Sequence, residues 1–234
     1  MSKIDLFCIP YAGGSAYTIY SKWHKKLNSK IRVQPLELAG HGSRMSEPFY
    51  DDVQNAVDDL MEKIKNHIRN RPYAIYGHSM GTLLAYELTV AVKVAGLPQP
   101  RALFLSGRQP PHHDYEGKKM YKMSDEEFLK NIKDIGGTPP LLFESSELVK
   151  VFLPILRNDY RLIEQYSLPQ HIIKIDSDFV FFYSYNDNHV TESGILEWKR
   201  YSNKSFEHYN FTGGHFFINE QWEQICMIIN QNLI

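Results

Sequence analysis

Cysteine is scarce in this sequence. Two of the 234 residues are cysteines, and both Cys8 and Cys226 lie within apolar runs. Two isolated cysteines do not make a disulfide framework, and in a reducing compartment they behave as small buried hydrophobes. A chain of this length can bury a continuous core without disulfides or metal ions. We therefore expect both thiols to be reduced and buried.

An excess of charge of one sign is also missing. The 26 basic and 27 acidic residues give a formal net charge of -1. Proteins that bind nucleic acid or anionic membranes through a global electrostatic field carry a clear basic surplus. The balance therefore predicts that nucleic acid is not a partner.

Long apolar runs are the third absence. No run approaches the roughly 20 residues that a membrane-spanning helix needs. The apolar stretch of MSKIDLFCIP, before Pro10, is too short for the core of a signal peptide. We expect a cytoplasmic protein with no membrane partner.

Strand-like and helix-like segments alternate along the chain. The predicted strands are Ile4–Ile9, Ile31–Leu38, Tyr73–Tyr76, Arg101–Ser106, Phe179–Tyr185 and Phe206–Phe211. The predicted helices are Ser15–Leu27, Asp51–Arg69, Met80–Ala95, Met123–Ile135, Ser146–Tyr166, Glu192–Tyr201 and Gln221–Leu233. Such alternation is typical of an α/β fold with a mostly parallel sheet and helices on both faces. We expect one domain over residues 1–234.

The alternation stops between residues 108 and 175. Two helices are predicted there, with the sequence GGTPP between them and no convincing strand. An all-helical insertion in an α/β sheet is naturally interpreted as a lid over the site. Its apolar residues are candidates for an acyl pocket, although ordinary packing is at least as good an interpretation. These candidates are Leu141, Leu142, Phe143, Phe152 and Leu153.

The sequence Gly77-His78-Ser79-Met80-Gly81 fits the G-x-S-x-G pattern. It follows a predicted strand and opens a predicted helix, which is the setting of a nucleophile elbow. The helix amino terminus there offers free amides and a positive dipole end to a developing oxyanion. Ser79 is therefore the predicted nucleophile, as part of an α/β-hydrolase fold.

A serine hydroxyl needs a base, and the base needs an orienting acid. In this fold the order along the chain is Ser, then Asp or Glu, then His, each on a loop after a strand. Asp187 follows the fifth predicted strand, and His215 follows the sixth through Thr212-Gly213-Gly214. We predict His215 as the base and Asp187 as the acid. Asp159 is set aside because it lies on a helix of the insertion.

The tetrahedral intermediate needs two backbone N–H donors. One is the amide of Met80, which directly follows the nucleophile. The other is expected in the glycine-rich loop Pro10-Tyr11-Ala12-Gly13-Gly14, after the first strand. Ala12 is the predicted second donor, and Gly13 is the alternative.

Several segments together resemble one family. PYAGGSA, ELAGHGSR, YGHSMG, LSGRQPP, LPILRNDYRLIEQY and FTGGHFFI occur in this order. The set resembles the stand-alone type II thioesterases of nonribosomal peptide and polyketide synthesis, over about residues 7–233. Two positions depart from that family's pattern, which often has glycine where this chain has Thr82 and Ser184. Neither removes a chemical group, but Thr82 could narrow the acyl pocket.

The resemblance implies an editing enzyme. It would hydrolyse acyl or aminoacyl thioesters from the phosphopantetheine arm of an acyl or peptidyl carrier protein, as a monomer that meets its carrier transiently. Ser79, Asp187 and His215 fall on the family's triad, and Met80 and Ala12 on its oxyanion donors. No cofactor or metal is implied, because phosphopantetheine belongs to the substrate. A basic group at Arg108, Lys118, Lys119 and Lys122 could meet an acidic carrier, although a solvated polar face is the better interpretation.

Three other functions remain open. Two are hydrolases of the same architecture: a medium-chain fatty acyl thioesterase and a general carboxylesterase. The third is a catalytically dead module that only binds a carrier protein.

Overall fold

A computed structural model describes residues 3–113, 119–168 and 171–234. Six strands form one sheet in the order β2-β1-β3-β4-β5-β6, and every neighbouring pair is parallel. The strands are β1 (Ile4–Ile9), β2 (Ile31–Pro35), β3 (Tyr73–His78), β4 (Ala102–Ser106), β5 (Asp178–Ser184) and β6 (Phe206–Phe211). The predicted α/β class with a parallel sheet is confirmed.

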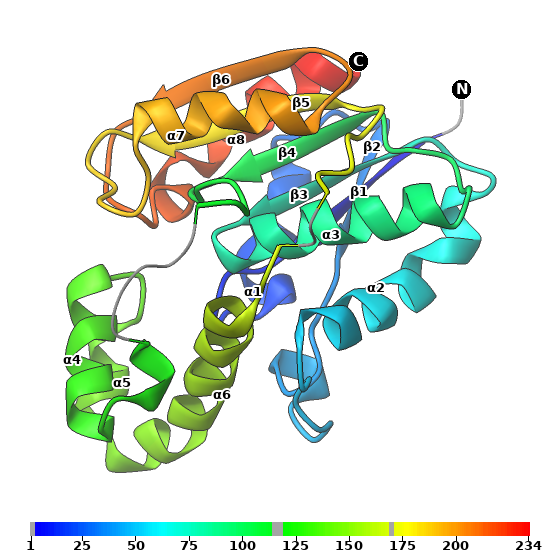
Figure 1. The fold of residues 1–234 in the computed structure, drawn as a ribbon. Coiled ribbons are helices and arrows are strands. Elements are labelled where there is room, and N and C mark those ends of the chain that lie inside the picture. Colours follow the sequence, from blue (N-terminus) through cyan, green and yellow to red (C-terminus); the bar gives the residue numbers. More distant parts are fainter. Residues whose placement is uncertain (1–2, 114–118, 169–170) are drawn as a thin grey trace.

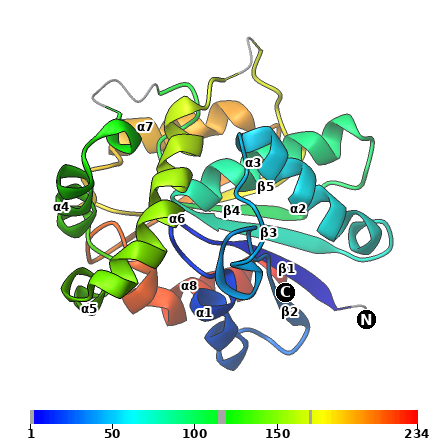
Figure 2. The ribbon, with the colours of Figure 1, turned by 90° about the horizontal axis from the view of Figure 1, so that it is seen from below.

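Helices cover both faces of this sheet (Figure 2). One face carries α1 (Ala16–Tyr20), the 3-10 helix η1 (Ser21–Lys25) and α8 (Ile218–Leu233), and their buried residues form one apolar cluster with the strands. The other face carries α2 (Val53–Ile68), α3 (Met80–Val94), α7 (Glu192–Glu197) and the 3-10 helix η4 (Trp198–Tyr201), which form a second cluster. The core therefore lies in two layers, one on each side of the sheet, and the sheet is held rigid beneath its loops.

Several element boundaries differ from the prediction, and two of them lie near the amino terminus. The helix expected over residues 15–27 divides into α1 and η1, although Ser15 caps it as predicted, accepting from the amide of Thr18. The strand expected to reach Leu38 ends at Pro35, and the amide of Leu36 donates one more hydrogen bond to the carbonyl of Cys8.

The regular elements that the structure describes between β4 and β5 are all helices. They are η3 (Met120–Lys122), α4 (Asp125–Ile135), α5 (Pro140–Glu144) and α6 (Ser146–Gln165), and the three α-helices lie together away from the sheet (Figure 1). Helix α4 begins after a capping box between Ser124 and Glu127. The short helix α5 was not predicted; it uses Pro140 in its first turn, where a missing N–H is harmless.

Candidate active site

Ser79 lies at the junction of β3 and α3 in a strained conformation. Its φ is 54° and its ψ is -115°. Among the residues that the structure describes, Ser79 is the one residue other than glycine whose φ is positive. A side chain on Gly77 would collide with the carbonyl of Gly81, and one on Gly81 would collide with the carbonyl of Ile9. The two glycines therefore permit the sharp turn that presents the Ser79 hydroxyl at the carboxyl end of the sheet.

The structure brings Ser79, His215 and Asp187 together. The Nε2 atom of His215 lies 2.9 Å from Ser79 Oγ, and its Nδ1 atom lies 2.8 Å from Asp187 Oδ2. The other oxygen of Asp187 accepts from the backbone N–H of His189 at 2.9 Å. Both carboxylate oxygens are thus engaged, which fixes the acid against the imidazole. This geometry can move a proton from a serine hydroxyl onto an oriented histidine.

The loops that carry the acid and the base are tied to one another. Ser184, at the end of β5, donates a hydrogen bond to the carbonyl of Gly213 in the loop before His215. Its hydroxyl also accepts from the amide of Asn186. A glycine at position 184 would offer neither contact. The serine that departs from the family pattern therefore joins the two catalytic loops.

Two further histidines, both with lowered pKa values, contact the ring of His215. His78 and His189 have ring centroids 5.2 Å and 4.9 Å from that of His215. Burial, with a smaller contribution from the charge of His215, holds the pKa of His78 well below its usual value. The same two causes, burial first, lower the pKa of His189. An imidazolium on His215 would therefore face two histidines whose lowered pKa values favour their neutral forms.

Existing hydrogen bonds of the loop after β1 limit which of its backbone N–H groups could bind an oxyanion. Gly13 donates its N–H to Asp159 Oδ2 at 2.7 Å, and Gly14 donates to the carbonyl of Tyr11. Ala12 lines a small pocket together with Ser79 and His215. Met80 is the first residue of α3, where backbone amides have no intrahelical partner. The amide of Gly13 is thus already engaged, and the amides of Ala12 and Met80 remain the candidate donors.

Asp159, set aside in the sequence, lies at the centre of a buried network. It projects from α6, its side chain is 1% exposed, and its Oδ2 atom accepts from Gly13 and from His41 Nε2 at 2.9 Å. Burial lowers the pKa of His41, but the charge and hydrogen bond of Asp159 outweigh it, so the pKa is raised overall. A sequence signal did exist. Asp159 falls on the same helix face as the buried Ile155, Leu162 and Ile163, where a lone carboxylate needs a partner.

Two pockets meet at Ser79, and they differ sharply. The larger one, of about 750 Å³, is lined mostly by polar side chains: Ser79, Gly107, Arg108, Gln109, His112, His113, Asn188, His189, Glu197 and Arg200. The smaller one, of about 20 Å³, is mostly apolar, with Tyr11, Ala12, Ile132, Ile135, Leu156, Tyr160 and Phe216 among its lining. The site therefore has one roomy polar approach and one tight apolar recess.

Thr82 does not line either pocket, so the expected narrowing of an acyl pocket is wrong. Its side chain is fully buried, and its hydroxyl bonds to the carbonyls of Gly77 and Ser106 at 2.9 and 2.7 Å. The same oxygen accepts from the amide of Ser106. Thr82 therefore joins β3 to β4 directly beneath the elbow.

The apolar residues suggested for the acyl pocket do not line either pocket at Ser79. Leu142 is buried and Leu141 is 65% exposed. Phe143 and Leu153 pack against the cluster of Phe128, Ile132 and Leu156, and Phe152 is half-buried. The alternative interpretation, packing between helices, describes Phe143 and Leu153.

The suggested basic group does not form one exposed patch among the described residues. Lys118 lies outside them. Arg108 is buried and lines the polar pocket, and Lys119 donates to the backbone carbonyl of Glu164 at 2.8 Å. Lys122 Nζ lies 5.6 Å from the centre of the Tyr121 ring. Separately, none of the helices in the described ranges combines the length and apolar character of a membrane span.

Comparison with known proteins agrees with this geometry. The thioesterase domain family matches residues 4–233. The linear gramicidin dehydrogenase LgrE of Brevibacillus parabrevis is 35% identical over 235 residues, which cover 99% of this chain and 88% of that protein. The crystal structure of ClbQ, from the colibactin NRPS/PKS pathway, superposes with a TM-score of 0.94 at 36% identity, covering 99% of this chain and 97% of that one.

A third similarity is to BorB, a type II thioesterase from the borrelidin biosynthetic cluster. Its structure has a TM-score of 0.89 at 30% identity and covers 99% of this chain and 93% of that one. The family match spans nearly the whole sequence, and the sheet, the helices and the elbow serine are those of an α/β-hydrolase. The chain belongs to the thioesterase family.

Proposed function

We propose that this chain is an editing, type II thioesterase that removes short acyl and aminoacyl groups from the phosphopantetheine arm of a carrier protein. The observation that carries the proposal is the relay from Asp187 through His215 to Ser79, at 2.8 and 2.9 Å. The similarity to ClbQ and to the type II thioesterase BorB supports a carrier-bound substrate in a nonribosomal peptide or polyketide pathway.

The first half of the reaction forms an acyl-enzyme. His215 Nε2 takes the proton of Ser79 Oγ as the oxygen attacks the thioester carbonyl carbon. The oxyanion accepts hydrogen bonds from the amides of Met80 and Ala12. When the carbon–sulfur bond breaks, the thiol sulfur leaves with the proton held by His215. Asp187 keeps the imidazole oriented and stabilises its charged form.

The second half releases the acid. Water gives a proton to His215 and attacks the acyl carbon, and the second tetrahedral intermediate uses the same two amides. Collapse returns the proton to Ser79 and frees the carboxylic acid. The carrier keeps a free thiol and can be loaded again.

The two pockets favour short acyl groups. An apolar recess of about 20 Å³ holds little more than one water-sized group, since a water needs a cavity of at least about 10–15 Å³. A short acyl group extending toward this recess would displace its walls less than a chain of eight carbons, which favours the proposed function over the medium-chain alternative. The polar pocket of about 750 Å³ suits the amide-bearing arm.

We further propose that α4, α5 and α6, within residues 108–175, act as the lid over this site. Ile132, Ile135, Leu156 and Tyr160 from α4 and α6 line the apolar recess, so the segment supplies one of its walls. Asp159 anchors α6 to the core, and α4 packs on α6 through Phe128, Ile132 and Leu156.

Hydride transfer, which the name of LgrE implies for that protein, is not proposed for this chain. A dinucleotide-binding turn follows the pattern G-x-G-x-x-G. The sequence contains G-x-G once, at Gly40-His41-Gly42, and Met45 stands where the third glycine is required. The side chain of His41, within that segment, is hydrogen-bonded to Asp159.

The test offers the purified protein a panel of carrier proteins loaded with acyl chains of two to ten carbons and with aminoacyl groups. Deacylation is followed by intact mass. We expect the short acyl and aminoacyl carriers to be cleared fastest. A preference for eight or more carbons would instead indicate a fatty acyl thioesterase, and a preference for oxygen esters would indicate a carboxylesterase.

Labelling separates an enzyme from a binding module. A fluorophosphonate probe should modify Ser79 in the wild type and fail to modify the Ser79→Ala variant. If the wild type is not labelled and no carrier is deacylated, the protein is a binding module.

A further inference from the structure

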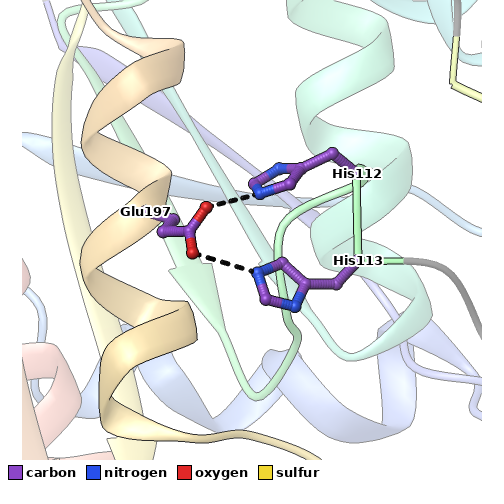
Figure 3. Close-up of side chains that lie close together, drawn as sticks. All are labelled: His112, His113 and Glu197. Atoms are coloured by element: carbon purple, nitrogen blue, oxygen red, sulfur yellow. Dashed lines mark hydrogen bonds and ion pairs between the residues drawn. The ribbon is translucent and has the colours of Figure 1, made fainter.

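Two adjacent histidines and a glutamate converge at the wall of the polar pocket (Figure 3). His112 and His113 follow β4, and Glu197 is the last residue of α7. The Nε2 atom of His112 lies 2.6 Å from Glu197 Oε2, and that of His113 lies 3.6 Å from Glu197 Oε1. The three potential ligand atoms lie within 4.8 Å of one another. The proposed hydrolysis uses none of these side chains.

The contact of His113 is incomplete. Its Nε2 atom is buried and makes no hydrogen bond within the described residues, so its ion-pair contact of 3.6 Å with Glu197 is too long to satisfy it. A buried polar atom left in this way costs about 1–3 kcal/mol. The distance of 3.6 Å between His113 Nε2 and Glu197 Oε1 is therefore not that of a hydrogen bond.

A bound metal ion explains that distance. Zinc binds histidine nitrogen and carboxylate oxygen at about 2.0–2.2 Å, so two ligands on a tetrahedral ion lie about 3.4 Å apart. The 3.6 Å between His113 Nε2 and Glu197 Oε1 is close to this value. His112 Nε2 is hydrogen-bonded to the other oxygen, Oε2, at 2.6 Å, and this hydrogen bond would break when both histidines share an ion with Oε1.

The surroundings of His112 also suit a ligand. Its Nδ1 atom lies 2.7 Å from the hydroxyl of Tyr201, and the two rings are stacked with an interplanar angle of 19°. Tyr201 is the last residue of η4, and its side chain is fully buried in the core. Metal-binding histidines are commonly fixed through their second ring nitrogen in this manner. The ring is therefore already oriented with Nε2 toward Glu197.

We propose that His112, His113 and Glu197 form a binding site for a divalent transition-metal ion such as zinc. With one carboxylate oxygen bound, the two histidines and the glutamate supply three ligands and leave a fourth position for water, and all three residues line the pocket shared with Ser79. Binding displaces the proton held between His112 Nε2 and Glu197 Oε2 to solvent. Arg200, which pairs with Glu197 at 3.3 Å, competes with the ion.

The proposal is tested on the full chain, stripped of metal and titrated with zinc chloride by equilibrium dialysis. We expect one zinc ion per wild-type chain at micromolar concentration. The variants His113→Ala and Glu197→Gln should bind at least about tenfold more weakly. Arg200→Ala should bind more tightly, because it removes the competing cation. His24→Ala, at an exposed histidine on η1, should bind like the wild type.

Two measurements keep the result interpretable. Circular dichroism and thermal unfolding without metal should show that Glu197→Gln is folded, since its amide can still bond to His112. Cobalt in place of zinc should give the visible absorption of a tetrahedral ion in the wild type only. Equal zinc affinity in the wild type, His113→Ala and Glu197→Gln, or no uptake by the wild type, would overturn the proposal.

Discussion

Asp159 accepts a hydrogen bond from the backbone N–H of Gly13 at 2.7 Å, across 146 positions of the chain. The contact joins the helix α6 to the loop that carries Ala12. Because Ala12 precedes Gly13 directly, the carboxylate sets the position of an amide proposed to stabilise the oxyanion. Asp159 is therefore a positioning residue, and its effect on catalysis passes through the loop.

Replacing Asp159 should slow turnover more than it weakens substrate binding. We expect Asp159→Ala to lower kcat by up to about 100-fold with little change in KM, because a displaced donor is lost mainly in the transition state. Asp159→Asn keeps an acceptor and should recover part of the loss. Asp125→Asn removes an exposed lid carboxylate that pairs with Arg157, and it should leave kcat unchanged. If Asp159→Ala instead raises KM and leaves kcat unchanged, Asp159 acts in substrate binding.

The pair of His41 and Asp159 should make stability depend on pH. Since the pKa of His41 is raised in the folded protein above its ordinary 6.5, the pair stabilises fully below pH 6.5. That contribution is lost as the pH rises through the folded-state pKa. Buried His78 and His189, with lowered pKa values, act in the opposite direction below 6.5. The informative quantity is therefore the difference between wild type and Asp159→Asn.

Urea unfolding of the two proteins between pH 5 and about 9 measures that difference. It should be largest at acid pH and shrink as the solution becomes alkaline. A difference that is constant over the whole range would mean that His41 carries no charge in the folded protein.

Thr82→Val should weaken the fold without changing acyl preference. The hydroxyl of Thr82 is bonded to two carbonyls and accepts from the amide of Ser106, and all of these groups are buried. Leaving them unsatisfied should cost about 1–3 kcal/mol in the free energy of unfolding. The ratio of rates for two-carbon and eight-carbon carriers should match the wild type. A changed ratio would mean that position 82 does reach the acyl group.

Ser79→Gly should be more stable than Ser79→Ala. Both variants lose the nucleophile and its bond to His215, but only glycine adopts a φ of 54° without steric strain. Strain of this kind costs on the order of 1–3 kcal/mol, part of which glycine gives back through the entropy of the unfolded chain. Thermal unfolding should therefore show a higher Tm for Ser79→Gly. Equal Tm values for Ser79→Gly and Ser79→Ala would show that the backbone at position 79 is not strained.

Local patterns predicted the parts of this molecule that depend on neighbours in the chain. The sheet follows from apolar runs such as Tyr73–Tyr76, and the elbow from glycines on either side of Ser79. Asp187 and His215 could be chosen because each follows a strand, and parallel strands end at one edge. Asp187 and His215 are therefore expected near Ser79, because Ser79 also follows a strand of the same parallel sheet.

The remaining features depend on contacts between distant segments. No spacing links Asp159 to Gly13, or His112 to Glu197 85 residues away. The role of Thr82 was mistaken because a residue one turn beyond the elbow can face either the pocket or the sheet. Only the packing of β3 against β4 decides which, and that packing directs its hydroxyl to Ser106.

The unequal pockets at Ser79 also bear on the order of events during one turnover. If the arm occupies the wide polar pocket and the acyl group fills the recess, little space remains for a hydrolytic water while the carrier is docked. The carrier would have to depart before the ester on Ser79 is hydrolysed. The enzyme would then follow double-displacement kinetics, and a thiol-bearing carrier that lingers would slow the release of the acid.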